Sequence, residues 1–487
     1  MTENDPFSKE LNRYRPYLSD EQFALLIAGS QQEAPSAIRI NTIKTKDPQS
    51  KLRELKNKYG WVSQPLPFSD TAEQITSWET YPSQTIEHKL GQFYIQDAAS
   101  ILPVSLFARS NKPLLSLDMA ASPGGKTTQM IDAGSDRNLV IANDASASRI
   151  PALRTVLQTW GSMNFAVTNF AGERWGDWYP EAFDQILLDA PCSMQSLRVS
   201  ASHPHRPISA DERGRLATRQ LAMLVSAARA LKVGGELVYS TCTLAPEEDE
   251  AVVSALLGIF PGVFEVDPEP ADRYGVRGLI EFEGQTYHSQ LEHSLRVWPF
   301  IFQTNGFFAV KLIKTTSITE ENSSRISPPQ SKADLKEIDQ DTRQLLFDFL
   351  QKQYGFSLEN LLRERNLGLF WRGDKPWLVP MALIENFPEL RFQTAGLPLG
   401  QFIRKDFEPS SDFFHSIGHL FTSGIWTIPD NLVSNWMKGY DIRGIELSGL
   451  TLGSLILVRD SEGNNLGAGK YSPNRLRNLL PNRHLIR

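Results

Sequence analysis

The chain has 487 residues, a formal net charge of −6, 41% hydrophobic residues, 22% charged residues and only two cysteines. These values are ordinary for a globular protein of about two to four domains with ample material for a core. No apolar run reaches the ~18 residues needed to span a bilayer, no signal-peptide pattern is present, and two cysteines exclude a disulfide framework. We therefore expect a cytoplasmic protein without membrane contact.

The N-terminal part carries no nucleotide-binding signature. Residues 6–29 have a helical pattern, residues 37–42 form a short strand-like run, and residues 50–59 form a charged helix. We expect a small α+β module over residues 1–105.

From residue 106 the pattern changes to apolar runs that alternate with helical segments such as residues 215–230. The runs predicted as strands are residues 114–118, 139–144, 165–168, 186–189 and 236–240. This alternation predicts an α/β fold with a Rossmann-like, doubly wound parallel sheet over residues 106–314, closed by a late strand at 307–312.

The chain then passes through a segment rich in Ser, Thr, Glu and Pro at residues 315–334, which has no apolar period and is predicted to be a linker. An amphipathic helix is expected at residues 335–354. A strand-rich, glycine-punctuated segment follows to residue 487, so that residues 335–487 form a C-terminal α+β extension.

The loop after the first predicted strand of the sheet suits a nucleotide. Its small residues would let a ligand approach the backbone, and the following helix would direct free amides at a carboxylate or phosphate. A phosphate loop is disfavoured, because Ala120 stands where that motif needs glycine. Asp144 ends the second strand, where an acid commonly accepts hydrogen bonds from ribose hydroxyls, although a helix cap is an equally ordinary role. The loop residues are Asp118, Met119, Ala120, Ala121, Ser122, Pro123, Gly124, Gly125 and Lys126.

Both cysteines directly follow predicted strands. Cys192 comes three residues after Asp189, and Cys242 follows the fifth strand. The carboxyl ends of parallel strands face one crevice, so we expect both thiols to lie in one site beside a carboxylate. That arrangement suits covalent chemistry on an electrophilic carbon. The alternatives are two inert core residues or a disulfide.

The cysteine motifs resemble those of the RNA 5-methylcytosine methyltransferases of the Nol/Nop/Sun class. The resemblance covers about residues 35–315, and the weaker C-terminal match, at residues 396–410 and 466–483, is similar to the bacterial branch called ribosomal small-subunit methyltransferase F. It is carried by Asp189-Ala190-Pro191-Cys192-Ser193, Ser240-Thr241-Cys242-Thr243, Ala121-Ser122-Pro123-Gly124-Gly125-Lys126, Arg39-Ile40-Asn41-Thr42, Gly91–Asp97, Lys232–Gly235, Pro246–Glu250 and Asn305–Phe308.

The resemblance implies an S-adenosylmethionine-dependent enzyme that methylates cytosine C5. Cys242 would be the thiolate that adds at C6, Asp189 would hydrogen-bond the N3 edge, and Cys192 would assist loss of the C5 proton and release. The implied cofactor-binding residues are Asp118, Ala120, Ala121, Ser122, Pro123, Gly124, Gly125, Lys126, Asp144, Arg149 and Asp189.

The implied partner is RNA, specifically small-subunit ribosomal RNA or the assembled subunit, held by the N-terminal module and a PUA-like C-terminal extension. We expect a monomer without a metal ion. Two alternatives stay open: a weakly active or non-catalytic RNA-binding protein of ribosome assembly, and a transfer RNA cytosine-5 methyltransferase.

The chain departs from the family pattern at three places, and the first two motivate the non-catalytic alternative. Residues 193–198, Ser-Met-Gln-Ser-Leu-Arg, replace a glycine-rich stretch with an arginine beyond it. Ala171 occupies the place of an acid that reads the adenine amino group, for which Asn169 or Glu173 could substitute. Residues 203–207, His-Pro-His-Arg-Pro, replace an acidic segment and are predicted to form a surface loop rather than a phosphate contact.

Other polar signals are weaker. His415 and His419 have the spacing of a helical metal pair, but no glutamate follows His415 and no third ligand is evident, so no metal site is expected. Residues 464–487 carry basic residues and no acid, which fits either a solvated end or an edge that contacts phosphate. The aromatic residues at 175–179 are expected to pack in the core.

Overall fold

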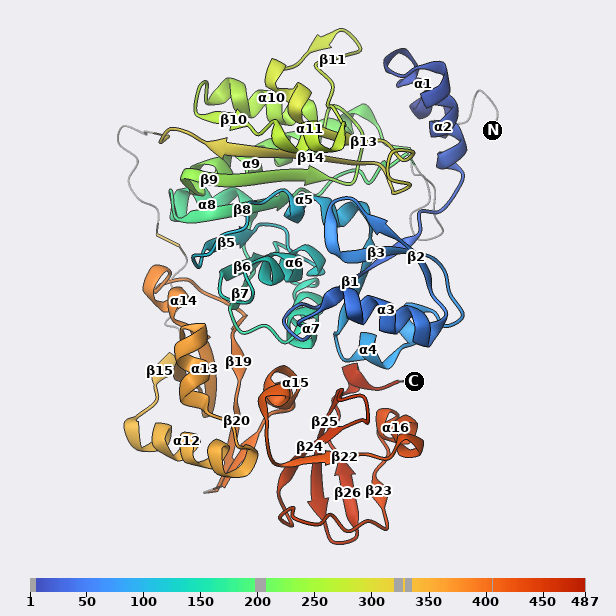
Figure 1. Ribbon diagram of the computed structural model, residues 1–487. Coiled ribbons are helices and arrows are strands. Elements are labelled where there is room, and N and C mark those ends of the chain that lie inside the picture. The colour runs from blue at the N-terminus through green and yellow to red at the C-terminus, as the bar shows by residue number, and fades with distance from the viewer. Residues whose placement is uncertain (1–5, 198–206, 319–326, 329–334, 405, 487) are drawn as a thin grey trace.

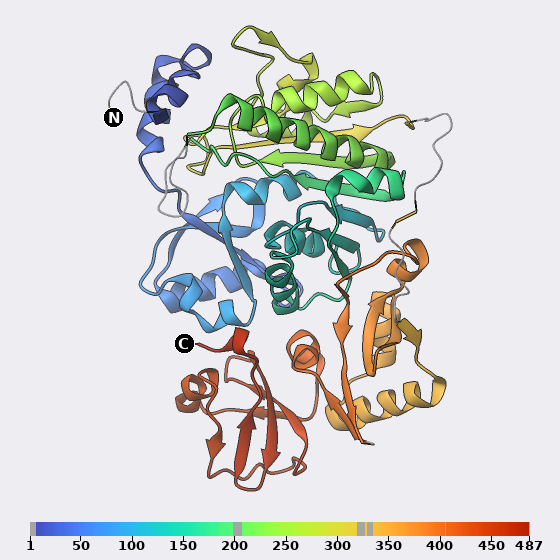
Figure 2. The same cartoon turned by 180° about the vertical axis from the view of Figure 1, so that it is seen from behind.

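The computed structural model describes residues 6–197, 207–318, 327–328, 335–404 and 406–486 (Figure 1). The N-terminal module lies beside a central sheet, and the C-terminal extension lies below that sheet in Figure 1. The C-terminal end of the chain returns to the N-terminal module, next to α4, in both views (Figures 1 and 2).

The N-terminal helical stretch is divided into two helices. Pro16 is the second residue of a short 3₁₀ turn at Arg15–Tyr17, and Ser19 then caps the second helix through a reciprocal capping box with Gln22. A four-stranded antiparallel sheet follows in the order β2-β3-β1-β4. The elements are α1 Pro6–Asn12, α2 Asp20–Ser30, β1 Ser36–Ile40, α3 Pro48–Tyr59, β2 Val62–Leu66, β3 Ser69–Ser77, α4 Ile86–Lys89 and β4 Phe93–Asp97.

The described part of the central sheet has nine strands. Their order is β10-β14-β9-β8-β5-β6-β7-β18, with β13 also paired to β14. The strands are β5 Leu115–Asp118, β6 Leu139–Asn143, β7 Phe165–Thr168, β8 Phe183–Asp189, β9 Leu231–Thr241, β10 Phe264–Val266, β13 Leu295–Val297, β14 Phe307–Lys314 and β18 Thr394–Ala395.

The strands are continuous apolar runs because both faces of the sheet are covered. Successive side chains of a strand point to opposite faces. Ile186 and Leu188 of β8 belong to the apolar cluster on one face, whereas Leu187 belongs to the cluster on the other. This two-sided burial is what the uninterrupted runs predicted.

The prediction of a parallel sheet is confirmed for β5 to β9 and wrong for the edges. The pairs β7-β6, β6-β5, β5-β8 and β8-β9 are parallel. In contrast, β14 is antiparallel to β9, and β10, β13 and β18 are also antiparallel to their neighbours. Apolar runs identify strands but not their direction, and antiparallel edge strands are common on α/β sheets.

Helices cover the two faces of the central sheet. Met223 of α9 and Trp175 of α8 pack in one apolar cluster, and Ile131 of α6 and Leu153 of α7 pack in the other. Figure 2 shows α9 lying over the strands. The elements are α5 Leu102–Ser105, α6 Gly125–Ala133, α7 Ile150–Trp160, α8 Trp175–Trp178, α9 Ala210–Ala230, α10 Glu250–Ile259 and α11 Glu269–Tyr274, with the hairpin β11 Glu281–Phe282 and β12 Gln285–Thr286.

The helix expected at residues 335–354 is shorter in the structure, because the extension begins with a strand. Residues Leu335–Glu337 form the strand β15, and the helix starts only after Asp339, whose side chain accepts a hydrogen bond from the Thr342 amide. The elements are α12 Gln340–Tyr354, α13 Leu358–Arg365, β16 Leu367–Arg372, β17 Lys375–Pro380, α14 Met381–Asn386, β19 Leu397–Pro398, β20 Gly400–Ile403, β21 Asp406–Pro409, α15 Ser411–Ile417, β22 Ile425–Thr427, α16 Asp430–Met437, β23 Ile442–Arg443, β24 Leu455–Arg459, β25 Asn465–Ser472 and β26 Arg475–Asn478.

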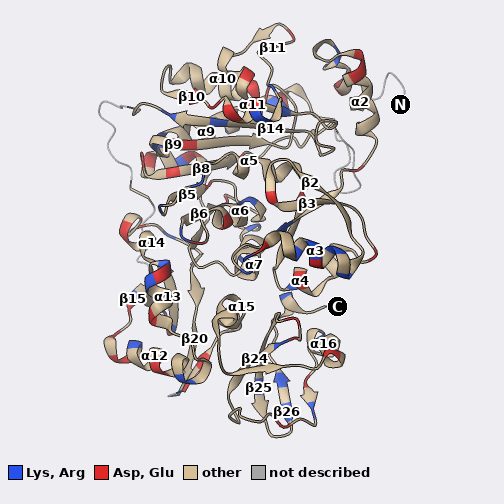
Figure 3. Cartoon of the chain, viewed as in Figure 1, with Lys and Arg blue, Asp and Glu red and all other residues tan. Residues whose placement is uncertain are grey.

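The extension contains a four-stranded sheet, β15-β16-β17-β19, a two-stranded sheet, β20-β21, and a five-stranded sheet, β22-β24-β25-β26-β23. It is also built into the central sheet, because Thr394 and Ala395 of β18 pair with β7. Within the described residues, no helix has the length and apolar character needed to cross a membrane. Acidic and basic residues occur together in the N-terminal module, the central sheet and the extension (Figure 3).

Candidate active site

The loop predicted to bind a nucleotide connects β5 to α6. Gly124, with φ of 117°, precedes the first residue of α6, and a Cβ there would approach Val156 at 3.0 Å. A side chain on Gly125 would come within 2.8 Å of the Tyr94 ring. The two glycines thus let the loop turn sharply against its neighbours.

Asp118, at the end of β5, is almost completely buried. Its Oδ2 accepts a hydrogen bond from Thr127 at 2.7 Å, and its Oδ1 has no partner in the described structure. Burial, which outweighs the Thr127 hydrogen bond, raises the pKa of Asp118 to about 7. This carboxyl therefore offers a buried oxygen beside the loop.

Asp144 is tied to the same loop. Its Oδ2 accepts from the Ser122 amide at 3.2 Å and lies 3.4 Å from Arg149, and its Oδ1 accepts from the Ser146 amide at 2.8 Å. Arg149 also donates to the Ser122 carbonyl. Ser122, Asp144 and Arg149, which the sequence assigned to one site, are therefore in contact.

A cavity of about 260 Å³ opens between these loops. Ala120, Asp144 and Arg149 line it as expected, together with Pro191 and with residues that the sequence did not single out. Those residues are Ala145, Ser146, Gly172, Arg219 and Met223, and Met119 of the predicted loop also lines the cavity. This lining suits an adenosine-containing sulfonium. Met119 and Met223 supply apolar thioether side chains, and Asp144 supplies a carboxylate suited to ribose hydroxyls.

Gly172 keeps this cavity open. A Cβ at Gly172 would come within 2.7 Å of the Met223 side chain, and 3.6 Å from that of Met119. The donor set and this free space fit S-adenosylmethionine. Met223 carries no sequence signal of its own, because it is an ordinary apolar residue of α9, whereas Met119 belongs to the predicted loop.

Neither of the two residues expected to substitute for the missing acid at Ala171, Asn169 and Glu173, lines this cavity. The Asn169 side chain is engaged, because it donates to the Asp144 carbonyl at 2.7 Å. Glu173 contacts Arg219, which lines the cavity, at 3.3 Å, and its second oxygen has no partner among the described residues.

The two thiols lie in contact at the ends of neighbouring strands. The Sγ atoms of Cys192 and Cys242 are 3.1 Å apart, and both cysteines are free. A disulfide bond is about 2.0 Å long, so this is a thiol contact. The Cys242 hydrogen bond, followed by burial, raises the pKa of Cys192 well above its ordinary value.

Asp189 joins the two thiol loops to the nucleotide loop. Its Oδ2 lies 2.8 Å from the Lys126 ammonium, and its Oδ1 accepts from the Ser240 hydroxyl at 2.8 Å. Burial would lower the pKa of Lys126, but the attraction and hydrogen bond of Asp189, together with the nearby Cys242 and Asp118, raise that pKa. Lys126 also lies over the Phe307 ring, with Nζ 5.6 Å from the centroid.

The loop after Cys192 is held by a buried carboxylate. Glu248 accepts from the Ser193 amide at 3.0 Å and from the Gln220 amide group at 2.9 Å, and Gln220 in turn donates to the Pro191 carbonyl. Burial raises the pKa of Glu248. These bonds fix the backbone on both sides of Cys192.

The glycine-poor sequence of this loop has a backbone consequence. Met194 and Leu197 adopt φ values of 59° and 58°, which non-glycine residues rarely occupy. Met194 is exposed, whereas Leu197 is buried. The backbone at Met194 therefore has a conformation suited to glycine, although the residue there is methionine. Arg198 and residues 203–206, noted in the sequence, lie outside the described residues.

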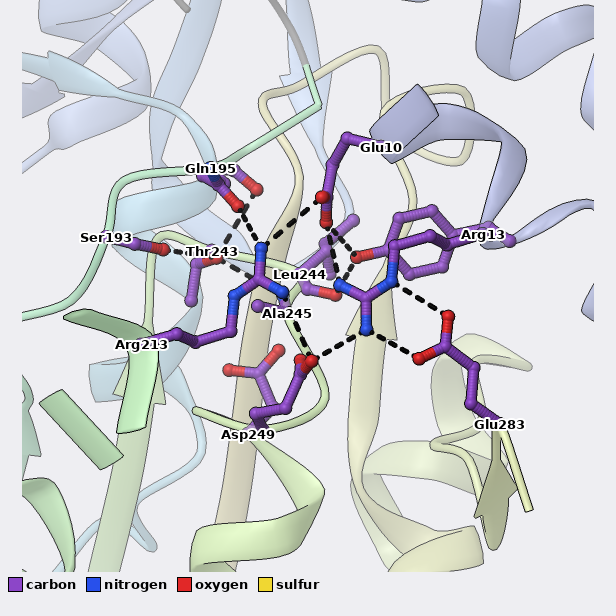
Figure 4. A network of polar contacts seen from close by, with 12 residues as sticks. Glu10, Arg13, Ser193, Gln195, Arg213, Thr243, Leu244, Ala245, Asp249 and Glu283 are labelled. Carbon is purple, nitrogen blue, oxygen red and sulfur yellow. Dashed lines mark hydrogen bonds and ion pairs between the residues drawn. The ribbon is translucent and has the colours of Figure 1, made fainter. Parts of the chain in front are cut away.

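Figure 4 shows that the N-terminal helix region braces both thiol loops. Arg213 of α9 contacts Glu10 at 3.3 Å, Glu247 at 3.1 Å and the Gln195 side chain at 3.0 Å. Arg13 reaches the same Glu247 at 2.6 Å. This ion network was not predicted, because its members lie far apart in the sequence.

The Arg39-Ile40-Asn41-Thr42 segment connects the N-terminal module to α6. Arg39 is buried, forms an ion pair with Asp132, donates to Thr128 at 2.6 Å, and lies over the Trp160 ring. The segment therefore positions the helix that follows the nucleotide loop.

Two further features noted in the sequence, the aromatic residues at 175–179 and the basic C-terminal end, have structural contacts. Trp175 is fully buried and packs against neighbouring aromatic rings, as expected. Lys470, Arg475 and Arg483 each pair with a carboxylate of the extension, whereas Arg477 is exposed. These pairs favour the structural interpretation of the basic end over a phosphate-binding edge.

Comparison with known proteins points in one direction. Residues 106–313 match the family described as 16S rRNA methyltransferase RsmB/F. The chain is 32% identical to ribosomal RNA small subunit methyltransferase F of Aeromonas hydrophila, over 99% of this chain and 97% of that protein. It is also 32% identical to the protein of the same description from Pectobacterium atrosepticum, over 96% of this chain and 93% of that protein.

Solved structures agree on the fold. A methyltransferase homologue from Pyrococcus horikoshii has a TM-score of 0.54 and 28% identity, covering 62% of this chain and 93% of that one. NSun6 from Pyrococcus horikoshii has a TM-score of 0.51 and 19% identity, covering 63% of this chain and 98% of that one.

Proposed function

This chain belongs to the RsmB/F family of 16S rRNA methyltransferases, and we propose how its residues carry out the reaction. It is an S-adenosylmethionine-dependent RNA cytosine-5 methyltransferase, and its substrate is small-subunit ribosomal RNA. The observation that carries the proposed mechanism is the contact of Cys192 and Cys242, 3.1 Å apart, next to the Lys126–Asp189 pair.

Cys242 is the nucleophile of this mechanism. The C5 carbon of cytosine is a poor nucleophile, and addition of the Cys242 thiolate at C6 breaks the C5–C6 double bond and makes C5 electron-rich. S-adenosylmethionine supplies the methyl group as a sulfonium. Asp189, held between Lys126 and Ser240, hydrogen-bonds the N3 edge as the ring gains electron density. The base must leave its stack to reach this site.

Cys192 is the base that completes the reaction. In the free enzyme the Cys192 thiol lies 3.1 Å from that of Cys242, and this contact is the first cause of its raised pKa. Once Cys242 forms a bond to C6, that cause is gone, and Cys192 can release its proton to solvent. The Cys192 thiolate then removes the C5 proton, the C5–C6 double bond re-forms, and Cys242 leaves as a thiolate. One proton is released per methyl group transferred.

The cofactor-binding role belongs to the loop residues 118–126 with Asp144 and Arg149. The contacts of Asp144 with Ser122 and Arg149, and the cavity between them, support this assignment. The Oδ1 atom of Asp118, which is buried without a partner among the described residues, is available to the cofactor.

The substrate RNA is held by the N-terminal module, residues 1–105, and by the extension, residues 335–487, on either side of the methyltransferase domain at 106–314. The five-stranded sheet with α16 supports a PUA-like identity for the end of the extension. The protein is proposed to act as a monomer.

Transfer of a labelled methyl group to small subunits from cells that lack this protein tests the mechanism. We expect transfer by the parent, none by Cys242→Ala, and a stable covalent protein–RNA species with Cys192→Ala. Full activity of Cys242→Ala would overturn the nucleophile. An active parent without a trapped species in Cys192→Ala would overturn the role in release. No cofactor binding by the parent would favour the non-catalytic alternative.

A further inference from the structure

The two thiol loops are joined beyond the thiols themselves. The hydroxyl of Ser193 donates to that of Thr243 at 3.1 Å, and each of these residues directly follows one of the two cysteines. Further along, the Leu244 amide donates to the Gln195 carbonyl at 3.0 Å. The thiol contact is therefore one of several contacts that join the two loops.

Gly306 lets a third segment close on these loops. Its amide donates to the Ser196 carbonyl at 3.0 Å, and a Cβ at this position would lie 2.3 Å from that carbonyl oxygen and 2.6 Å from the Leu244 side chain. Only glycine therefore fits here without moving the loop backbone. The Asn305–Phe308 segment, noted in the sequence, thus supports the far end of the loop of Cys192.

Four charged side chains form a closed ring of ion pairs beside these loops. Arg13 contacts Glu10 at 3.1 Å and Glu247 at 2.6 Å, and Arg213 contacts the same two carboxylates at 3.3 Å and 3.1 Å. Figure 4 shows Glu10 between the two arginines. Burial would raise the pKa of Glu247, but Arg13 and then Arg213 outweigh it and lower that pKa. Glu247 is therefore ionised at neutral pH and holds both arginines.

Arg213 connects this ring to the loop of Cys192. Its Nη2 atom contacts Glu10 and also donates to the Oε1 atom of Gln195 at 3.0 Å, while its Nη1 atom contacts Glu247. A planar guanidinium has fixed donor directions, so it sets the positions of its partners more closely than a flexible ammonium does. Glu10, Arg213 and Gln195 thus form a clamp between α1 and the loop of Cys192.

The loop of Cys242 has anchors that do not involve the clamp. Its Leu244 carbonyl accepts from the buried Tyr14 hydroxyl at 2.7 Å and from the buried Arg296 guanidinium at 2.8 Å. The cysteine itself directly follows β9, a central strand of the sheet. Loss of the clamp should therefore displace Cys192 more than Cys242.

The proposed reaction requires the two sulfur atoms to act on adjacent carbons of one base. Cys242 is bonded to C6 at the time when the Cys192 thiolate removes the proton from C5. The spacing of the two loops must therefore be kept throughout the covalent stage. A misplacement of about 1 Å can cost on the order of 100-fold in rate. A displaced Cys192 would leave the adduct formed but slow to break down.

We propose that Gln195 and Arg213 are positioning residues for release of the methylated RNA. The clamp holds Cys192 within reach of C5 while Cys242 is bonded to C6, and Glu10 links this loop to the N-terminal module. The inference rests on the proposed function, because that function supplies the covalent intermediate. Both residues act through Cys192, and the chemistry stays with the two thiols.

The test measures formation and decay of the covalent protein–RNA adduct separately, on denaturing gels, with the full-length chain. A labelled small-subunit rRNA transcript reports formation, and a chase with unlabelled transcript reports decay. In Gln195→Ala and in Arg213→Met we expect formation at the parental rate and an adduct that persists about 10- to 100-fold longer. Gln195→Glu keeps an acceptor for Arg213 and should restore the parental lifetime. The matched control is Arg215→Met, because Arg215 is an exposed arginine of the same helix.

A double variant separates a shared contact from two independent effects. If Gln195 and Arg213 act through the contact between them, their effects are not additive. The adduct of the double variant Gln195→Ala, Arg213→Met should then last no longer than that of the slower single variant. Lifetimes that multiply in the double variant would overturn the clamp as the common cause.

Parental adduct lifetimes in Gln195→Ala and Arg213→Met would overturn the proposal, as would an equal lengthening in the Arg215→Met control. Urea unfolding of each variant is measured in parallel, and Gln195→Ala keeps the test decisive if Arg213→Met does not fold. Equal slowing of formation and decay, with a lower unfolding midpoint, would assign the clamp to stability alone and overturn it. Methyl transfer by the parent with unchanged lifetimes in the variants sinks the clamp alone. A parent that forms no adduct and transfers no methyl group overturns the proposed reaction and the clamp with it.

Discussion

Replacing Arg296 by methionine should destabilise the protein and disturb the loop that carries Cys242. Arg296 and its two acidic partners, Asp249 and Glu250, are fully buried. The guanidinium donates to Glu250 at 2.9 Å and to the Leu244 carbonyl at 2.8 Å, two residues after Cys242. Asp249 also accepts from Thr241, the residue before Cys242.

The size of the expected loss of unfolding free energy follows from the burial of Arg296 and its partners. Removing one partner of a buried ion pair leaves an uncompensated charge and costs about 3–5 kcal/mol. Removing an exposed partner costs less than about 1 kcal/mol. Arg273, whose side chain is 57% exposed and pairs with Glu269, provides the matched control as Arg273→Met.

Urea unfolding of the full chain measures both variants. Burial raises the pKa of Asp249 well above its ordinary value even with Arg296 present. Without Arg296 the folded Asp249 carboxyl holds its proton more tightly than the unfolded one, so the loss of unfolding free energy should grow as pH rises from about 5 to 8. Methyl transfer should also fall at temperatures below unfolding. A loss below about 1 kcal/mol, equal to that of Arg273→Met, would refute the reasoning.

Four further outcomes are expected. Met194→Gly should leave methyl transfer intact and raise the unfolding free energy by up to about 1 kcal/mol, because the φ of 59° no longer meets a Cβ; a clear loss would contradict this. Leu197→Gly, at a similar φ of 58° but buried, should instead lose about 2–3 kcal/mol of packing in the same urea titration. Asp118→Asn should flatten the decline of unfolding free energy between about pH 4 and 7, since the folded carboxyl has a pKa of about 7 and holds its proton where the unfolded one is ionised; an unchanged pH profile would exclude that shift. Glu248→Ala should prolong the covalent RNA adduct while adduct formation by Cys242 continues, because it frees the loop of Cys192, and an adduct lifetime equal to that of the parent would show that the carboxylate does not position this loop.

The central part of the site could be predicted from the sequence because of simple geometry. Apolar runs that alternate with helical segments favour a parallel sheet, and the residues that follow parallel strands meet at one edge of that sheet. This rule predicts one site for Asp118, Asp144, Asp189, Cys192 and Cys242. Their roles came from the resemblance rather than from spacing, and they remain predictions.

Contacts between distant segments depend on the tertiary structure. Lys44 and His415 are separated by 371 residues, and Arg13 and Glu247 by 234, and no local pattern links either pair. The edge strand β18 and the direction of β14 were missed for the same reason, since propensity identifies a strand but not its neighbour.

For this protein, the local sequence by itself determined the strands, the turn chemistry and the crevice at their carboxyl ends, because these follow from side-chain periodicity and backbone sterics within a few residues. Only the tertiary structure decided the ion network over the thiol loops and the contact of Lys44 with His415 between the N-terminal module and the extension. Those features arise from packing between segments hundreds of residues apart. Burial at these contacts sets the energy of each electrostatic interaction, which the list of charged residues in the sequence does not give.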